Sequence, residues 1–133
     1  MKILFICRHN VFRSRVAEEH MKKISKHEIS SGGLIRYNGN VHPIQAEVCK
    51  EFGLILSNQS KALSVENLKD QDLVVVVADD VPEGIVDWYV SKDKLRRWEI
   101  KDVHPQNMNK EEARRIVKEI IRKVDELNDE FKD

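Results

Sequence analysis

A cysteine and an arginine, separated by five residues, stand near the start of the chain in the stretch ICRHNVFRS. Cys7 ends the apolar run ILFIC, and Arg13 is followed directly by Ser14, where apolar residues begin to recur at helical spacing. A loop between a strand and a helix aims backbone amides at one point, and the helix dipole adds positive charge there. An arginine that closes the loop can bind two oxygens of a tetrahedral oxyanion, and the positive charge favours the nucleophilic thiolate. The stretch therefore predicts an oxyanion-binding loop with Cys7 placed for attack.

Two further side chains of this stretch suit such a loop. Asn10 can bridge loop carbonyls and amides, and Ser14 can donate a hydrogen bond to the thiolate or to the departing sulfur. A lone cysteine at a strand end is usually a small buried apolar residue, so the combination of residues carries the hypothesis. A Walker-type nucleotidase is excluded, because no G-x4-G-K-[ST] motif occurs in the chain.

The apolar pattern around the loop predicts an α/β fold. Two runs are continuously apolar, Lys2–Ile6 after its first residue and LVVVVA after Asp72, which is typical of parallel strands buried on both faces. Ligands of such sheets bind beyond the carboxyl ends of the strands, where Cys7 stands. Further strands are predicted at Glu28–Ser31 and Leu95–Ile100. Helices are predicted from Ser14 to about Lys26, from Pro43 to Gly53, over Val65–Leu68, briefly within Asp79–Tyr89, and after Asn109, with Lys132 and Asp133 frayed.

The length and composition of the chain exclude several classes of protein. The 133 residues fit a single domain, and the 23 basic residues balance the 23 acidic ones. A zero net charge argues against a nucleic-acid binder or a binder of anionic membranes, and no apolar run approaches the length of about 18 residues that a membrane span needs. Two cysteines form no disulfide framework, which favours the cytoplasm. The five histidines show no ligand spacing, so we expect no metal and no cofactor.

The stretch ICRHNVFRS resembles the C-x2-N-x2-R-S phosphate loop of the low-molecular-weight protein tyrosine phosphatase family, whose relatives include thioredoxin-type arsenate reductases. ISSGGL, VHPIQAEVCKEFGLILSNQSKAL, LKDQDLVVVVAD and RWEIKDVHP extend the resemblance along nearly the whole chain. It implies one three-layer α/β/α domain over residues 1–133, with a four-stranded parallel sheet in the order 2-1-3-4. It also implies that Cys7 forms a phosphocysteine, that Arg13 clamps the transition state, and that Asp102 is the general acid.

The resemblance gives the other loop residues supporting roles. It implies that Asn10 shapes the loop and that Ser14 assists the thiolate. Backbone amides come mainly from Arg8, His9, Val11 and Phe12. The side chains of Arg8 and His9 are expected at the rim of the pocket, where they affect specificity.

The chain departs from the family pattern around the general acid. Asp102 is followed by Val103 instead of proline, so Asp79, Asp80 and His104 compete with it for the role. The paired tyrosines that follow the acid in many family phosphatases are absent. Trp88, Tyr89 and His104 are therefore expected to line the pocket rim.

Three functions remain open at this point. The first is a cysteine phosphatase that hydrolyses an aryl phosphate, such as phosphotyrosine in a protein. The second is an arsenate reductase or arsenate–thiol transferase that uses Cys7 with an external thiol, because VVVVADDVPEGIV contains no relay cysteine and Cys49 falls on the apolar face of a predicted helix. The third is a non-catalytic module that binds an oxyanion (phosphate or arsenate) or a phosphoprotein, which the sequence DVH at the acid position favours. The physiological substrate and the oligomeric state stay open.

Overall fold

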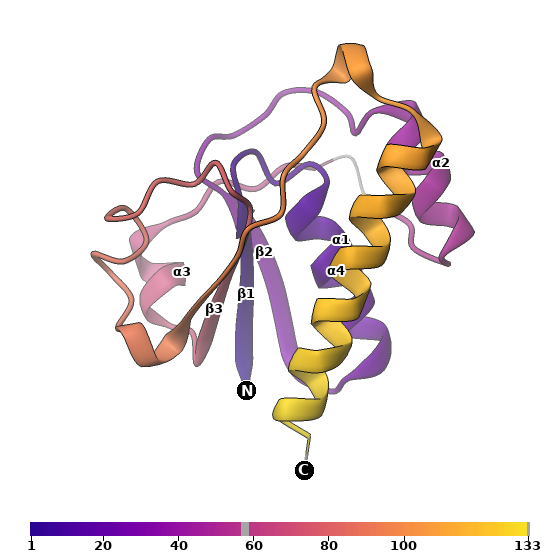
Figure 1. Cartoon of the computed structure of the whole chain (residues 1–133). Coiled ribbons are helices and arrows are strands. Elements are labelled where there is room, and N and C mark those ends of the chain that lie inside the picture. Colours follow the sequence, from indigo (N-terminus) through magenta and orange to yellow (C-terminus); the bar gives the residue numbers. More distant parts are fainter. Residues whose placement is uncertain (57–58, 133) are drawn as a thin grey trace.

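A sheet of four parallel strands forms the middle layer of the molecule (Figure 1), and the computed structural model describes residues 1–56 and 59–132. Its order is β2 (Glu28–Gly33), β1 (Lys2–Cys7), β3 (Leu73–Val77) and β4 (Leu95–Trp98), as predicted. Cys7 pairs with Gly33 and Ile6 pairs with Val76, so the carboxyl ends of the three neighbouring strands meet at one edge.

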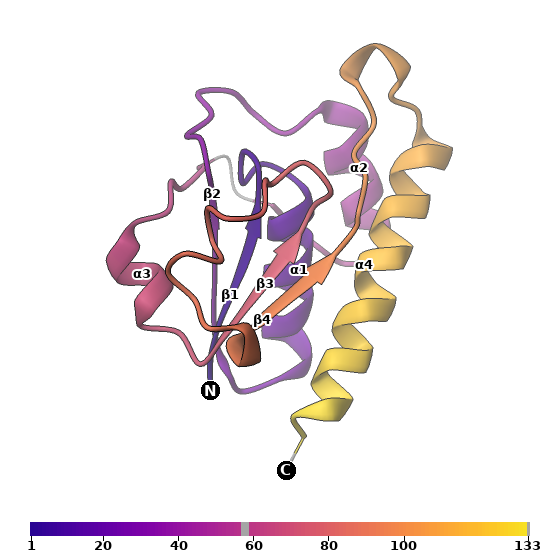
Figure 2. The same ribbon diagram turned by 60° about the vertical axis from the view of Figure 1, so that its left-hand side comes forward.

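Helices cover both faces of the sheet unequally (Figures 1 and 2). Three of them pack on one face, and a single short helix with the loop after β3 covers the other. The helices are α1 (Arg13–Ile24), α2 (Pro43–Glu51), α3 (Val65–Lys69) and α4 (Lys110–Glu130), with 3₁₀ turns at Lys92–Lys94 and Pro105–Asn107. Among the described residues, no helix is both long and apolar enough to cross a membrane.

Successive side chains of the strands point to opposite faces of the sheet and form two hydrophobic cores, one on each face. Ile3 and Phe5 of β1 face the core formed with α1, α2 and α4, whereas Leu4 and Ile6 face the core on the α3 side. All four side chains are buried. Burial on both faces explains why β3, and β1 after Lys2, are apolar at every position and not at every second one.

The segment from Asp79 to Tyr89 differs from the prediction, because it forms a series of turns and no helix. Gly84 has a φ of +89°, a left-handed conformation that interrupts a helical turn. Val86 and Val90 turn inward and pack in the second core. Asp133, which was predicted to be frayed, lies outside the described residues.

β2 also runs further than predicted, through Gly33. A Cβ atom on this glycine would lie 2.8 Å from the backbone nitrogen of Asn10 and 2.8 Å from the backbone carbon of His9. Real Cβ contacts are not that short, so only glycine allows this close approach. The end of β2 therefore packs directly against the loop that follows β1.

Candidate active site

The loop of residues 8–12 connects the end of β1 to the start of α1 at the carboxyl edge of the sheet. Phe12 holds the N-cap position and makes no side-chain capping bond in the described part of the chain. The first backbone amides of a helix have no hydrogen-bond partner within the helix, so the N-terminus of α1 is suited to bind an anion. Cys7 and Ser14 face each other across this loop, with 2.9 Å between Sγ and Oγ.

Asn10 holds the loop in shape. Its φ of +54° makes it the only described non-glycine residue with a positive φ, and asparagine tolerates this conformation better than most residues. Its side chain donates to the hydroxyl of Ser14 at 2.8 Å and to the hydroxyl of Ser31 at 2.9 Å, and it accepts from the backbone N–H of Lys61 at 2.9 Å. The asparagine therefore joins the loop, α1, β2 and the segment before α3.

A buried polar chain continues beyond Asn10. The hydroxyl of Ser31 donates to a carboxylate oxygen of Glu18 at 2.6 Å, and the other oxygen of Glu18 pairs with Lys22 at 3.0 Å. Glu18 is only 2% exposed. Sequence reasoning missed Glu18 and Ser31, and the available signals were the i,i+4 spacing of Glu18 and Lys22 and a serine inside a predicted strand.

Carboxylates and a carbonyl surround the Arg13 guanidinium. Nη1 donates to the backbone oxygen of Ile100 at 2.9 Å, and Nη2 donates to Asp80 at 2.9 Å. Asp79 lies 3.5 Å from Nη1, and Asp102 lies 4.0 Å from Nε. The side chain is 5% exposed, so these contacts fix the plane of the guanidinium.

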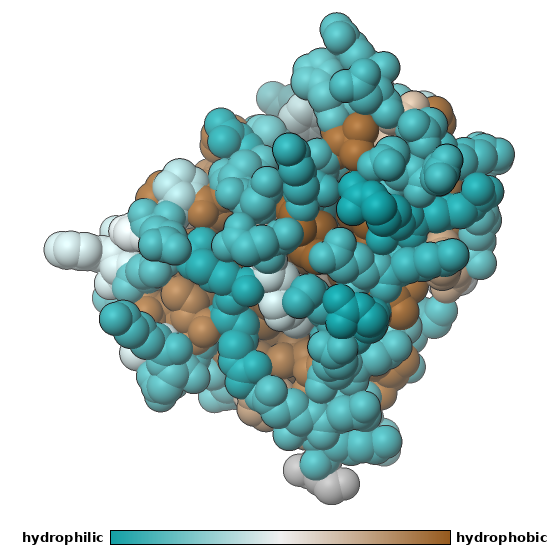
Figure 3. Space-filling view, viewed as in Figure 1, coloured by the Kyte–Doolittle hydropathy of each residue, from teal (hydrophilic) through white to brown (hydrophobic). Residues whose placement is uncertain are grey.

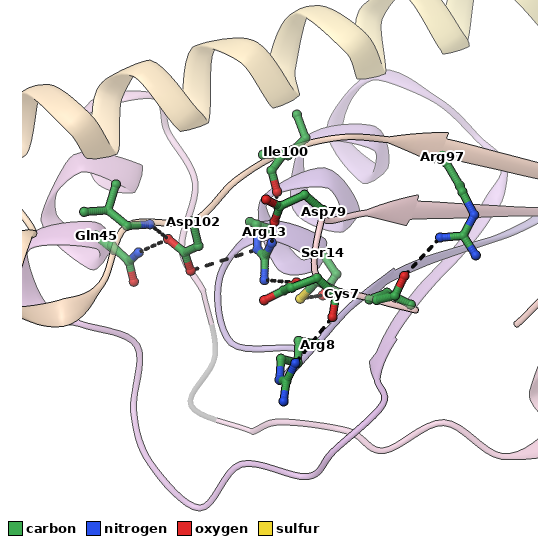
Figure 4. Close-up of polar contacts among 12 residues, drawn as sticks. Cys7, Arg8, Arg13, Ser14, Gln45, Asp79, Arg97, Ile100 and Asp102 are labelled. Atoms are coloured by element: carbon green, nitrogen blue, oxygen red, sulfur yellow. Dashed lines mark hydrogen bonds and ion pairs between the residues drawn. The ribbon is translucent and has the colours of Figure 1, made fainter. Parts of the chain in front are cut away.

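Asp102 lies across the site from the loop and is held at one oxygen. Its Oδ1 accepts from the backbone N–H of Val103 at 2.8 Å and from Gln45 at 3.2 Å, which leaves Oδ2 on the side of Arg13. Figure 4 shows Gln45 and Asp102 together on one side of Arg13. Partial burial raises the pKa of the Asp102 carboxyl above its ordinary value, against the opposing effects of the Val103 N–H and of Arg13.

The competing candidates for the general acid lie elsewhere. A cavity beside the loop holds Cys7. Asp79 and Asp80 contact Arg13 from the end of β3, but they are not among the described residues that line this cavity. His104 caps the 3₁₀ turn after Asp102 by accepting from the N–H of Gln106 at 3.2 Å, and it does not line the cavity either. Of the four, the structure brings Asp102 into the cavity that holds Cys7.

The cavity has a volume of about 590 Å³ and a mostly apolar wall. His9 and Tyr37 stand together at its rim, with their ring centroids 5.6 Å apart. The exposed Arg8 side chain is not among the described residues that line it, and it donates to the backbone oxygen of Asp80 at 3.5 Å. The lining residues are Cys7, His9, Val11, Phe12, Arg13, Tyr37, Asn40, Val41, His42, Pro43, Gln45, Asp102, Val103, Pro105 and Met108.

The expected rim residues Trp88 and Tyr89 are not brought to this cavity. Trp88 is 80% exposed, because the turn after β3 directs its neighbours Val86 and Val90 into the core on the α3 side. Tyr37, from the segment after β2, stands at the rim beside His9 instead. Hydrophilic residues cover most of the face in Figure 3, with apolar patches between them.

Cys49 is a residue of α2 that packs into the core between this helix and the sheet, with no exposed surface. Burial raises the pKa of its thiol to about 12, so it stays protonated and unreactive at neutral pH. Within residues 1–56 and 59–132, no group of three or more His, Cys, Asp or Glu side chains is arranged to hold a metal ion.

Comparison with known proteins places this site in a family. The model of the family described as low molecular weight phosphotyrosine protein phosphatase matches residues 2–133, so the chain belongs to that family. The low molecular weight protein tyrosine phosphatase from T. tengcongensis is similar in structure, with a TM-score of 0.82 and 27% identity over 98% of this chain and 99% of that one.

Curated relatives include arsenate reductases. Arsenate reductase 2 of Staphylococcus haemolyticus is 38% identical over 81 residues, which are 59% of this chain and 60% of that protein. The match thus spans less than two thirds of that relative. The glutaredoxin arsenate reductase of Synechocystis is 24% identical over 127 residues, which are 95% of each chain.

Proposed function

We propose that this protein is a cysteine phosphatase that hydrolyses an aryl phosphate, namely phosphotyrosine in a protein, through a phosphocysteine. One observation carries the proposal: Cys7, Arg13 and Asp102 line a single cavity at the N-terminus of α1. A nucleophile, a clamp for the oxyanion and an acid for the leaving group are the groups that this reaction needs.

In the first step, the Cys7 thiolate attacks phosphorus and the bond to the aryl oxygen breaks. The loop amides and Arg13 bind the phosphoryl oxygens, because each terminal nitrogen of Arg13 keeps a second N–H beyond its bond to Ile100 or Asp80. Asp102, whose partial burial raises the pKa of its carboxyl and so favours the protonated form, transfers its proton to the leaving phenolate. Phenol leaves, and the phosphoryl group stays on the sulfur.

In the second step, water attacks the phosphocysteine. The Asp102 carboxylate accepts a proton from this water, inorganic phosphate leaves, and the thiolate of Cys7 returns. The hydroxyl of Ser14, 2.9 Å from Sγ, donates a hydrogen bond to the departing sulfur. Each step therefore uses groups that the chain itself supplies.

The cavity wall supports an aryl substrate. Val11, Val41, Val103 and Met108 contribute apolar surface to the lining, and Tyr37 stands at the rim. A phenyl ring buries apolar area against such a wall, whereas a small polar alcohol gains less. A reactive thiol also needs a reducing compartment, so we place the protein in the cytoplasm.

The arsenate reductase names of the curated relatives favour a second candidate, an arsenate–thiol transferase. Cys7 would attack arsenate in the same loop. Cys49 cannot then attack the Cys7–arsenate adduct, because it is fully buried in the core. An external molecule must therefore supply this second thiol. The third candidate, a binding module without turnover, receives less support because Asp102 lines the cavity despite the missing proline.

Release of phenol from phenyl phosphate by the purified protein near pH 6 tests the proposal. Wild type and the control Cys49→Ala should be active, Cys7→Ser inactive, and Asp102→Asn slower by roughly a hundredfold or more. Absence of turnover in wild type would overturn the phosphatase. Arsenate-dependent oxidation of an added thiol would then favour the transferase, and tungstate binding without either reaction would favour the binding module.

A further inference from the structure

A second cavity of about 370 Å³ adjoins the active-site cavity, and the mechanism above does not use it. The two cavities share Tyr37 and Asn40, so the Tyr37 side chain stands between them. In contrast to the mostly apolar active-site wall, the lining is mostly polar. It consists of Arg36, Tyr37, Asn38, Gly39, Asn40, Gln59, Ser60 and Lys61.

The charge of this second cavity is positive. Arg36 and Lys61 are both exposed, and the lining contains no acidic residue among those described. Within residues 1–56 and 59–132, neither cation lies within ion-pair distance of a carboxylate. Arg114, by contrast, binds Glu51 through two nitrogens, and Arg96 pairs with Glu130. Two cations without a counterion beside a phosphate-binding loop can receive a second anionic group.

The walls of the second cavity are fixed to the phosphate loop. The N–H of Lys61 donates to the Asn10 side chain, and the oxygen of Lys61 accepts from the N–H of Gly33 at 2.8 Å. The hydroxyl of Ser60 donates to the backbone oxygen of His9 at 2.6 Å and accepts from the N–H of Tyr37 at 3.2 Å. The cations are therefore carried on backbone whose distance from the loop is set by hydrogen bonds.

We propose that this cavity is a subsite for an acidic side chain that flanks the phosphorylated residue of a peptide substrate. A ligand with its aryl phosphate in the first cavity must pass Tyr37 to reach Arg36 and Lys61, and an extended peptide can do so. The inference rests on the proposed phosphatase function and adds to it the chemistry of the residues around the phosphotyrosine.

Phosphotyrosyl peptides with glutamate on both sides of the phosphorylated residue, compared with their glutamine counterparts, test the subsite. Each exposed ion pair changes an equilibrium by a factor of about 1.5 to 5. Wild type should therefore show a kcat/KM roughly three- to tenfold higher for the glutamate peptide at low salt, with the preference shrinking at high salt. The double variant Arg36→Gln/Lys61→Gln should lose the preference, and Lys69→Gln on α3 should retain it.

Hydrolysis of p-nitrophenyl phosphate separates this inference from the proposed function. It should stay within about twofold of wild type in the double variant, because the backbone contacts of Lys61 do not depend on its side chain. If wild type hydrolyses p-nitrophenyl phosphate but treats both peptides equally, or if the double variant keeps the preference, the subsite is refuted and the phosphatase stands. If no aryl phosphate is hydrolysed, both proposals fall.

Discussion

Replacing Ser31 with alanine removes one hydroxyl from the buried chain between Asn10 and Glu18. That hydroxyl accepts from the Asn10 amide at 2.9 Å and donates to the Glu18 carboxylate at 2.6 Å. The substitution leaves one N–H of Asn10 without an acceptor, and it leaves one oxygen of Glu18 without its donor. Both groups are fully or almost fully buried, at 0% and 2% exposure, so water reaches neither of them easily.

The expected loss of stability follows from these two contacts. A hydrogen bond to a charged group contributes about 1.5 to 3 kcal/mol, and a buried donor left unpaired costs about 1 to 3 kcal/mol. The two effects share one hydroxyl, so they add to less than their sum, and we expect a decrease of about 2 to 4 kcal/mol in the free energy of unfolding. Catalysis should also slow, because Asn10 then loses one of the contacts that fix its left-handed conformation.

Urea unfolding followed by circular dichroism measures the first effect, and steady-state hydrolysis of an aryl phosphate measures the second. Ser30→Ala is the matched control, since Ser30 is the adjacent half-buried serine on the same strand. We expect the control to stay within about 0.5 kcal/mol of wild type. If the free energy of unfolding of Ser31→Ala were less than about 1 kcal/mol below that of wild type, the buried hydrogen-bond chain would not be what holds the loop.

Three further predictions concern the ionisable groups of the chain. Arg13→Lys should lower kcat/KM for an aryl phosphate at least about a hundredfold in steady-state assays, because an ammonium cannot hold Ile100 and Asp80 and also bind two phosphoryl oxygens. Because the pKa of Asp102 is raised in the folded state, its protonated form extends to higher pH, and the stability it contributes is lost as pH rises through that pKa. In urea unfolding, the stability of Asp102→Asn relative to wild type should therefore increase as the pH is raised from 3 to 7. The descending limb of the plot of kcat against pH should also disappear. Cys49, with a pKa of about 12, should resist an aromatic disulfide reagent in the folded Cys7→Ser variant and react only in urea.

The proximity of residues that lie close together in the sequence was predictable. Cys7, Asn10 and Ser14 meet in space because one strand, one short loop and one helix start bring them together. The continuous apolar runs likewise indicated β1 and β3, since strands buried on both faces cannot alternate. β2 was predicted two residues too short because its glycines were interpreted as a turn, whereas Gly33 pairs with Cys7 in the sheet.

Residues whose role depends on long-range packing were not predictable. Trp88 was expected at the rim because it follows β3, but the inward packing of Val86 and Val90 decides its direction. Tyr37 reaches the rim from a loop that no periodicity describes. Glu18 is a charged residue on a helix, a position that is usually solvated, and only the contact with Ser31 shows its place.

The bare backbone of Gly33 has a consequence for the proposed hydrolysis. Its close packing against the backbone of His9 and Asn10 leaves the phosphate loop no room to relax toward β2 when product departs. Ordering a backbone costs about 1 to 2 kcal/mol per residue. For the five residues between Cys7 and Arg13 that ordering belongs to folding, which happens once. Each new oxyanion therefore meets amides that are already in place, and its binding energy is not divided between holding the ligand and shaping the loop.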